Sequence, residues 1–162
     1  MLQPAFMNGI SLLRKYNFTY DILIFKDQLQ YVPQFVSAFP DQSFVIDHLS
    51  KPDIKNKEID QWRKDIAVLG AFKNLYCKIS GMVTEADWRG WEKEDFKPYM
   101  DAVMEIFGID RIMFGSDWPV CLVAASYDKV VEIVEDYFSS FSRNEQEKFF
   151  GLNAIAFYNL QH

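Results

Sequence analysis

Four short apolar runs, each followed by a segment with helical spacing, constrain the fold of this chain more than any other feature. The runs lie at residues 20–25, 43–48, 75–80 and 111–115. Each run is apolar on both faces, as a strand buried between helices must be. Strands that alternate with helices form βα units and a parallel sheet. We therefore predict an α/β fold with four parallel strands and outer helices.

Segments with helical spacing separate these runs. An amphipathic helix is predicted at residues 4–15, with Pro4 in its first turn. Asp27 is expected to cap a helix at residues 28–38, although Pro33 is unfavourable inside a helix. Further helices are predicted at residues 58–72, 96–107, 126–138 and 143–160.

The composition indicates one packed globular domain. Of the 162 residues, 49% are hydrophobic and 17% aromatic, and no low-complexity segment or linker divides residues 1–162. The net charge of -6, without a dense Lys/Arg run, repels phosphate backbones and argues against a nucleic-acid partner. The apolar runs are too short to span a membrane and no signal-peptide pattern is present, so we expect no membrane partner and a cytoplasmic location.

The supply of reactive side chains limits the possible chemistry. Cys77 and Cys121 lack the spacing of a metal site and are expected to be buried reduced thiols. Of the two histidines, His162 is the last residue, which leaves His48 as the candidate for chemistry. The seven glycines are scattered, so no nucleotide cofactor is expected. A Gly-x-Ser-x-Gly elbow is absent, which argues against a serine hydrolase.

Polar side chains follow three of the predicted strands. Right-handed crossovers place all strand ends at one edge of a parallel sheet, where catalytic groups collect. If side chains alternate to the last residue of each strand, His48 shares a face with Ile46, whereas Asp117 shares a face with Met113 and Gly115. The polar residues at this edge are Asp47, His48, Lys78, Ser80, Ser116 and Asp117.

Each of these residues also has a purely structural interpretation. Ser116 and Asp117 suit the cap of a following helix. His48 could bond a loop carbonyl, and Lys78 could pair with Asp47 or Asp117. Ionisable groups at the ends of three successive strands nevertheless exceed what helix capping requires.

Together these side chains suit the hydrolysis of an activated carbonyl compound. Asp117 would take a proton from water, while His48 or Lys78 would stabilise the negative charge that develops on the carbonyl oxygen. Three tryptophans could form the wall of a substrate pocket, although ordinary loop packing explains Trp88 and Trp91 equally well. The three are Trp88, Trp91 and Trp118.

Three motifs in register resemble the amidohydrolase superfamily, and in particular its amidohydrolase-related branch of lactonases acting on sugar and 2-pyrone-dicarboxylate lactones. They are Phe-Val-Ile-Asp-His-Leu-Ser-Lys-Pro at 44–52, Tyr-Cys-Lys-Ile-Ser-Gly at 76–81 and Arg-Ile-Met-Phe-Gly-Ser-Asp-Trp-Pro at 111–119. The segments Tyr20-Asp21-Ile-Leu and Asn153-Ala154-x-x-Phe157-Tyr158 look similar to the same family. The resemblance therefore spans nearly the whole chain.

The resemblance implies the C-terminal half, strands five to eight, of a (β/α)₈ TIM barrel that hydrolyses a small-molecule lactone. By this likeness, Asp117 is the general base on the eighth strand and His48 is the catalytic histidine of the sixth. His48 and Asp117 would also ligate one divalent metal, zinc, where a metal is present. The implied substrate-binding residues are Lys78, Ser80, Trp88 and Trp118.

The sequence departs from the family pattern in its length. A complete barrel needs about 250 residues, and the His-x-His pair of the family's first strand is absent. An incomplete barrel leaves two unpaired edges and an open inner face. We expect a separate polypeptide, an N-terminal half encoded upstream or a second copy in a homo-oligomer to cover them. The alternatives to a lactonase are a catalytically silent, truncated half-barrel that binds a partner, and a decarboxylase of the same family.

Overall fold

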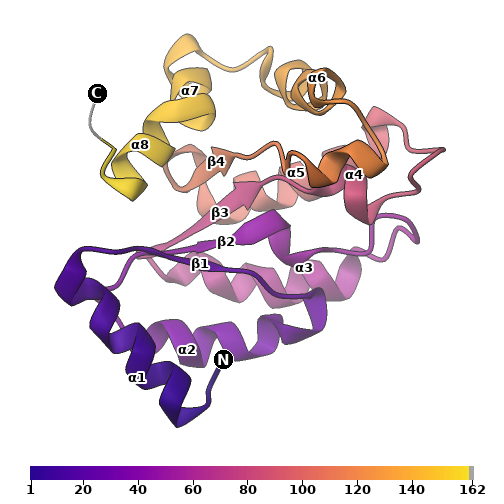
Figure 1. Cartoon of the computed structure of the whole chain (residues 1–162). Coiled ribbons are helices and arrows are strands. Elements are labelled where there is room, and N and C mark those ends of the chain that lie inside the picture. The colour runs from indigo at the N-terminus through magenta and orange to yellow at the C-terminus, as the bar shows by residue number, and fades with distance from the viewer. Residues whose placement is uncertain (161–162) are drawn as a thin grey trace.

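In the computed structural model, which describes residues 1–160, the chain folds into a four-stranded parallel sheet with helices around its outer side (Figure 1). The strands lie side by side in chain order and are β1 (Tyr20–Ile22), β2 (Phe44–Ile46), β3 (Leu75–Ile79) and β4 (Ile112–Phe114). All three pairings are parallel. The predicted α/β fold with four parallel strands is confirmed, and each strand is shorter than its apolar run.

The helices also follow the predicted order, except for the short α4, which was not predicted. They are α1 (Pro4–Leu13), α2 (Val32–Ser37), α3 (Asp60–Ala67), α4 (Met82–Glu85), α5 (Lys93–Phe107), α6 (Tyr127–Phe138), α7 (Arg143–Glu147) and α8 (Asn153–Tyr158). A π-helical stretch, Lys148–Leu152, joins α7 to α8, so helical structure runs through most of the predicted 143–160 helix. No helix in the described part of the chain has the length and apolar character needed to cross a lipid bilayer.

One predicted helix was wrong in its first part. Residues 28–38 do not form a single α-helix capped by Asp27, because Asp27 lies inside a 3₁₀ segment, Lys26–Tyr31. The α-helix starts only at Val32, with Pro33 in its first turn. Proline is tolerated there because the backbone N–H groups of a first turn have no intrahelical partner.

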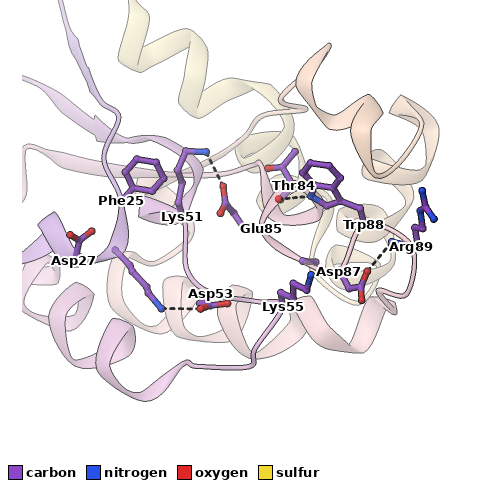
Figure 2. Close-up of a pocket in the computed structure, with 12 residues that line it drawn as sticks. Phe25, Asp27, Lys51, Asp53, Lys55, Thr84, Glu85, Asp87, Trp88 and Arg89 are labelled. Atoms are coloured by element: carbon purple, nitrogen blue, oxygen red, sulfur yellow. Dashed lines mark hydrogen bonds and ion pairs between the residues drawn. The ribbon is translucent and has the colours of Figure 1, made fainter.

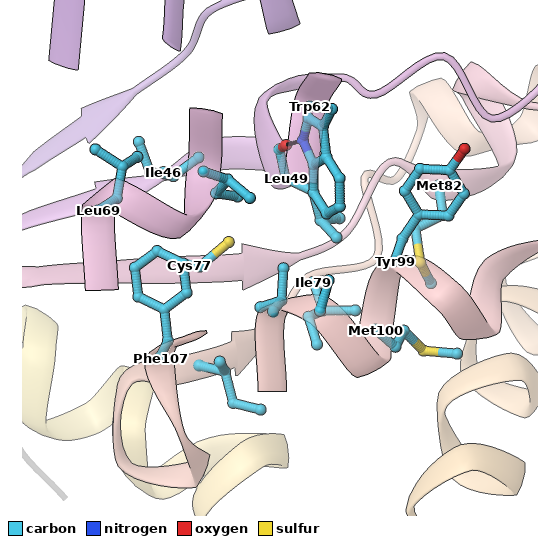
Figure 3. Packing of buried hydrophobic residues seen from close by; sticks show 14 of the residues in the cluster. Ile46, Leu49, Trp62, Leu69, Cys77, Ile79, Met82, Tyr99, Met100 and Phe107 are labelled. Carbon is cyan, nitrogen blue, oxygen red and sulfur yellow. Dashed lines mark hydrogen bonds between the residues drawn. The ribbon is translucent and has the colours of Figure 1, made fainter. Parts of the chain in front are cut away.

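The main core lies between the sheet and the outer helices (Figure 3). Ile46, Cys77 and Ile79 point from β2 and β3 toward α3 and α5, where Trp62 and Phe107 are fully or almost fully buried. Cys77 and Cys121 are both buried free thiols, and burial raises the pKa of each. The expectation of buried reduced thiols is confirmed.

The opposite, inner face of the sheet carries a second and smaller apolar cluster. Val45 and Met113 pack there against Phe157 of α8, with Tyr76 and Tyr158 at its margin. Towards the carboxyl ends of the strands this face becomes polar. The free edges of β1 and β4, the first and last strands of the sheet, are where further strands of a barrel would attach.

Candidate functional site

His48 and Asp117 face each other at the carboxyl edge of the sheet. The Nε2 atom of His48 lies 3.6 Å from Oδ1 of Asp117, and both side chains are mostly shielded from solvent. The prediction that His48 shares the face of Ile46 was wrong, because β2 ends at Ile46 and His48 has a left-handed backbone with φ of 49°. Asp117 is also left-handed, with φ of 56°. These turns bring together two side chains that strand alternation would place on opposite faces.

The left-handed conformation at His48 continues through Lys51. Four successive residues have φ between 49° and 59°, and none of them is glycine. Such conformations cost roughly 1 kcal/mol or more per residue and persist only where surrounding contacts impose them. One such contact is a hydrogen bond of 2.8 Å from the buried indole N–H of Trp62 to the carbonyl oxygen of Leu49. Strain of this kind concentrates at functional sites.

Two glycines make room for the site. A β-carbon at Gly81 would lie 2.9 Å from the His48 ring, and Gly81 has a φ of +64° that disfavours other residues. A β-carbon at Gly115 would lie 2.9 Å from the β-carbon of Ser80. Gly115 therefore leaves room for the side chains of Ser80 and Lys78 on the neighbouring strand. The role of Gly81 was missed, although the dipeptide Ser80-Gly81 at a strand end is a signal for such a turn.

Ser80 orients the imidazole of His48. The serine is almost completely buried, and its Oγ lies 2.8 Å from Nδ1 of His48. The serine hydroxyl can donate to an unprotonated Nδ1 or accept from a protonated one. In either case the second ring nitrogen, Nε2, is directed to Asp117. The structure therefore places Ser80 behind His48 rather than in the open part of the site.

Lys78 forms a network on the inner face below this pair. Its ammonium group lies 2.7 Å from Asp21 and 2.6 Å from Asp47, and the Tyr158 hydroxyl donates to Asp21 at 2.7 Å. Burial alone lowers the pKa of Lys78, but hydrogen bonds to the two carboxylates outweigh it and raise the pKa. Burial is also the main cause that raises the pKa of Tyr158 to about 12. Lys78 thus pairs with Asp47, one of the two partners considered, and with Asp21.

Asp117 does not cap the helix that follows it. The N-cap of α6 is Ser126, whose hydroxyl accepts from the backbone N–H of Lys129. Ser116 accepts from the backbone N–H of Trp118 in a local turn. The Asp117 side chain faces His48 on one side, and its Oδ2 lies 3.4 Å from the hydroxyl oxygen of Thr84 on the other. Because the Thr84 hydroxyl donates to the Gly81 carbonyl at the shorter distance of 2.7 Å, the second oxygen of Asp117 keeps its capacity to accept a proton.

The three tryptophans occupy different places. Trp91 is a packing residue, because its ring contacts Phe96 and its N–H donates to the carbonyl of Ala124. Trp118 is largely exposed next to Asp117. Trp88 lines a cleft of about 660 Å³ that also includes Thr84 (Figure 2). Asp117 does not line this cleft, but its Oδ2 lies 3.4 Å from the hydroxyl oxygen of Thr84, which does.

Residues 1–160 supply too few donor atoms to hold a metal ion. Two ligands of one tetrahedral zinc lie roughly 3.4 Å apart, which is close to the observed 3.6 Å between His48 and Asp117. A catalytic zinc takes three protein ligands. Residues 1–160 contain no group of three or more histidine, cysteine or acidic side chains placed to hold a metal. Residues 1–160 alone therefore supply fewer ligands than a catalytic zinc requires.

Comparison with known proteins places this geometry in a family. The amidohydrolase family model matches residues 2–160. An L-fucono-1,5-lactonase from Burkholderia multivorans is 39% identical over 96% of this chain, which covers 56% of that enzyme. An L-rhamnono-gamma-lactonase from Scheffersomyces stipitis is 25% identical over 97% of this chain, which covers 54% of that enzyme. The chain thus spans about half the length of the curated relatives that it matches.

A solved structure agrees with the sequence match. The crystal structure of an amidohydrolase from Burkholderia multivorans with bound zinc superposes with a TM-score of 0.91 at 39% identity, covering 98% of this chain and 58% of that one. The four parallel strands and outer helices thus correspond to a half of a TIM barrel, as predicted. The chain belongs to the amidohydrolase family.

Proposed function

We propose that this chain supplies the catalytic base of a lactone hydrolase. The observation that carries the proposal is the opposition of His48 and Asp117, 3.6 Å apart at the carboxyl edge of the sheet. A carboxylate and an imidazole at this spacing can both reach a water molecule and the carbonyl group that the water attacks. The similarity to two sugar lactonases favours a lactone over an amide.

In the proposed reaction, Asp117 accepts a proton from water while the water oxygen bonds to the lactone carbonyl carbon. Negative charge develops on the carbonyl oxygen, and an Nε2–H group of His48 stabilises it by a hydrogen bond. The ring C–O bond then breaks, and the proton held by Asp117 passes to the leaving alkoxide. The product is an open-chain hydroxy acid. Ser80 keeps the His48 ring in place through the bond to Nδ1.

The open edges of the sheet require a covering segment in the active protein. Large apolar side chains are exposed next to both edges: Leu23 and Phe25 follow β1, and Trp118, Val120 and Leu122 follow β4. Exposed apolar patches and unpaired strand edges mark surfaces that other chain segments cover. We propose four further βα units of the same family as the covering segment, because these would complete the eight strands of a barrel.

Metal binding is proposed only for the site that the covering segment completes. If a metal binds there, His48 and Asp117 would be the ligands from this chain, and a third would come from the covering segment. Nε2 of His48 would then carry no proton, and the metal would polarise the carbonyl group in place of the Nε2–H hydrogen bond. The proposed reaction itself includes no metal, because the donor set of residues 1–160 is incomplete. Zinc analysis of the chain alone and of the completed assembly tests this proposal. Stoichiometric zinc in the chain alone would contradict it.

A second candidate function follows from the same incomplete donor set. A catalytically silent half-barrel would bind a ligand or a partner chain without turnover. A panel of aldonolactones, assayed by acid release, separates the two functions. The purified chain is tested alone and after co-expression with the N-terminal part of a lactonase relative. Hydrolysis in either preparation supports the lactonase, whereas a stable complex without any hydrolysis supports the silent half-barrel.

A further inference from the structure

Two consecutive residues at the end of β2, Asp47 and His48, are both held by side chains from β3. The Lys78 ammonium lies 2.6 Å from Oδ1 of Asp47, and the Ser80 hydroxyl oxygen lies 2.8 Å from Nδ1 of His48. Lys78 and Ser80 are two residues apart, so their side chains share the inner face of the sheet. Adjacent residues of a regular strand point to opposite faces, and the left-handed φ of 49° at His48 allows both Asp47 and His48 to reach this face. The turn at His48 is therefore held from β3 at two successive positions.

The position of the Asp47 carboxylate depends on Lys78. The two side chains are shielded from water, with 15% of Asp47 and 17% of Lys78 exposed. Oδ1 of Asp47 is buried and has no hydrogen-bond partner among the described residues, so the ammonium is the group that compensates its charge. A shielded carboxylate that loses its cation is strongly unfavourable. The backbone that leads into His48 is therefore fixed by the place that the Lys78 ammonium occupies.

Groups from β1, from α8 and from the end of β4 determine where that ammonium lies. It is 2.7 Å from Oδ2 of Asp21, and the Tyr158 hydroxyl donates to the same oxygen at 2.7 Å. The ammonium is also 5.6 Å from the centre of the Tyr158 ring, a distance at which an aromatic ring attracts a cation. A β-carbon at Gly115 would lie 3.3 Å from Cδ of Lys78, so this glycine leaves space for the lysine chain. A free lysine side chain has many rotamers, and these contacts select one of them.

The last helix of the chain brings Tyr158 to this place. Tyr158 is the final residue of α8, which lies beside β4 (Figure 1). Its neighbour Phe157 is almost fully buried and packs against Val45 and Met113 on the inner face of the sheet. This apolar contact anchors α8 and leaves the Tyr158 hydroxyl at Asp21. A feature 110 residues away from His48 in sequence is thus connected to it by direct contacts.

We propose that Tyr158, Asp21 and Lys78 are positioning residues for His48, so that the packing of α8 on the inner face sets the orientation of the imidazole. The three residues act through Asp47 and do not touch the reacting atoms. A small displacement of a group that stabilises a transition state can cost a large part of the rate. The catalytic consequence rests on the proposed lactonase function, whereas the positioning itself is a property of the chain with or without turnover.

The test observes the His48 ring directly. Tyr158→Phe removes only the hydroxyl and keeps the ring that packs on the inner face, and Asp21→Asn breaks the same line of contacts one step nearer to His48. Tyr76→Phe is the matched control, because it removes a hydroxyl from a partly buried tyrosine of the same apolar cluster but outside this line. The ¹⁵N shifts of the His48 imidazole are recorded at one pH for each variant of the 162-residue chain. The values of kcat and KM are measured in whichever preparation hydrolyses lactones.

We expect altered Nδ1 and Nε2 shifts in Tyr158→Phe, larger changes in Asp21→Asn, and the shifts of the unmodified chain in Tyr76→Phe. The kcat should fall by about threefold in Tyr158→Phe and by about tenfold in Asp21→Asn, with little change in KM. Unchanged imidazole shifts in both variants, or equal changes in Tyr76→Phe, would overturn the proposal and leave these residues a role in stability alone. The absence of hydrolysis in every preparation would instead count against the proposed function, and the imidazole shifts would still decide whether these residues position His48.

Discussion

The indole N–H of Trp62 donates to the carbonyl oxygen of Leu49 at 2.8 Å, which ties helix α3 to the left-handed turn that carries His48. Trp62 is 1% exposed and Leu49 is fully buried, so water cannot replace the bond. A buried carbonyl left without a donor costs about 1–3 kcal/mol. The contact therefore helps to maintain a backbone conformation that is locally unfavourable.

Trp62→Phe should lower the free energy of unfolding by about 2 kcal/mol and disturb the His48 ring. The first effect is measured by urea denaturation and the second by the imidazole resonances of His48. Trp91→Phe is the matched control, because it also removes an indole-to-carbonyl hydrogen bond, but one to Ala124. The control should lose stability without moving the His48 resonances. Unchanged His48 resonances in Trp62→Phe would show that the turn does not depend on this bond.

Ser80→Ala should reduce lactone hydrolysis by about tenfold while costing only about 1 kcal/mol of stability. The substitution removes the partner of Nδ1, so the His48 ring loses its fixed orientation. The ¹⁵N shifts of the imidazole report the change directly. Ser37→Ala, which removes an exposed hydroxyl that donates to Pro33, is the control. An unaltered rate and unaltered imidazole shifts in Ser80→Ala would exclude a positioning role for Ser80.

Lys78→Met should destabilise the chain by about 2 kcal/mol, because Asp21 and Asp47 then face each other without a cation. The expected value lies below that of a fully buried pair, since the Asp21 side chain is 35% exposed. Lys148→Met removes an ion pair with the exposed Asp110 and should cost less than about 0.5 kcal/mol. Urea denaturation compares the two variants. Equal losses would mean that the inner-face network adds nothing beyond a surface ion pair.

The sequence allowed much of the architecture to be predicted but not the geometry of the turn at His48. Apolar runs and helical spacing were enough for four parallel strands, and the strand ends located His48, Ser80 and Asp117. The left-handed run was not predictable, because no residue in it is glycine and the conformation is held by contacts distant in sequence. Trp62 supplies one of them. Gly81 supplies another by leaving space for the imidazole.

The contacts of the inner-face network around Lys78 could not be predicted from the sequence either. Lys78 lies 57 residues from Asp21, and Tyr158 lies 137 residues from it. The segments around Asp21 and Tyr158 resembled the family, but spacing along the chain does not show that they touch. Only the packing of α8 on the inner face brings them together.

The stability of the chain should fall in acid partly through Asp53. Hydrogen bonds from the Asn56 side chain, together with its backbone N–H and Lys26, lower the pKa of Asp53 below its ordinary 3.8 despite the opposing effect of burial. A carboxyl group with a lowered folded-state pKa stabilises the fold above pH 3.8, and that stabilisation is lost as the pH falls through the folded-state value.

Urea midpoints measured from about pH 6 to about pH 2.5 test this effect. The difference between the unmodified chain and Asp53→Asn should shrink as the pH falls through this range. Asp65→Asn, which alters a carboxylate on α3 that accepts from the Gln61 side chain, is the control. A difference for Asp53→Asn that stays constant with pH would contradict the assigned linkage.

The central claim is that Asp117 removes a proton from the attacking water. Asn is nearly isosteric with Asp and accepts a left-handed φ well, so Asp117→Asn should fold with the observed backbone. The variant is assayed in whichever preparation hydrolyses lactones, the purified chain or the co-expressed assembly. There kcat should fall by at least about a hundredfold with little change in KM. Asp65→Asn should retain the full rate. The most direct measurement is therefore kcat of Asp117→Asn: a loss of this size is predicted, and a kcat equal to that of the unmodified protein would contradict the account.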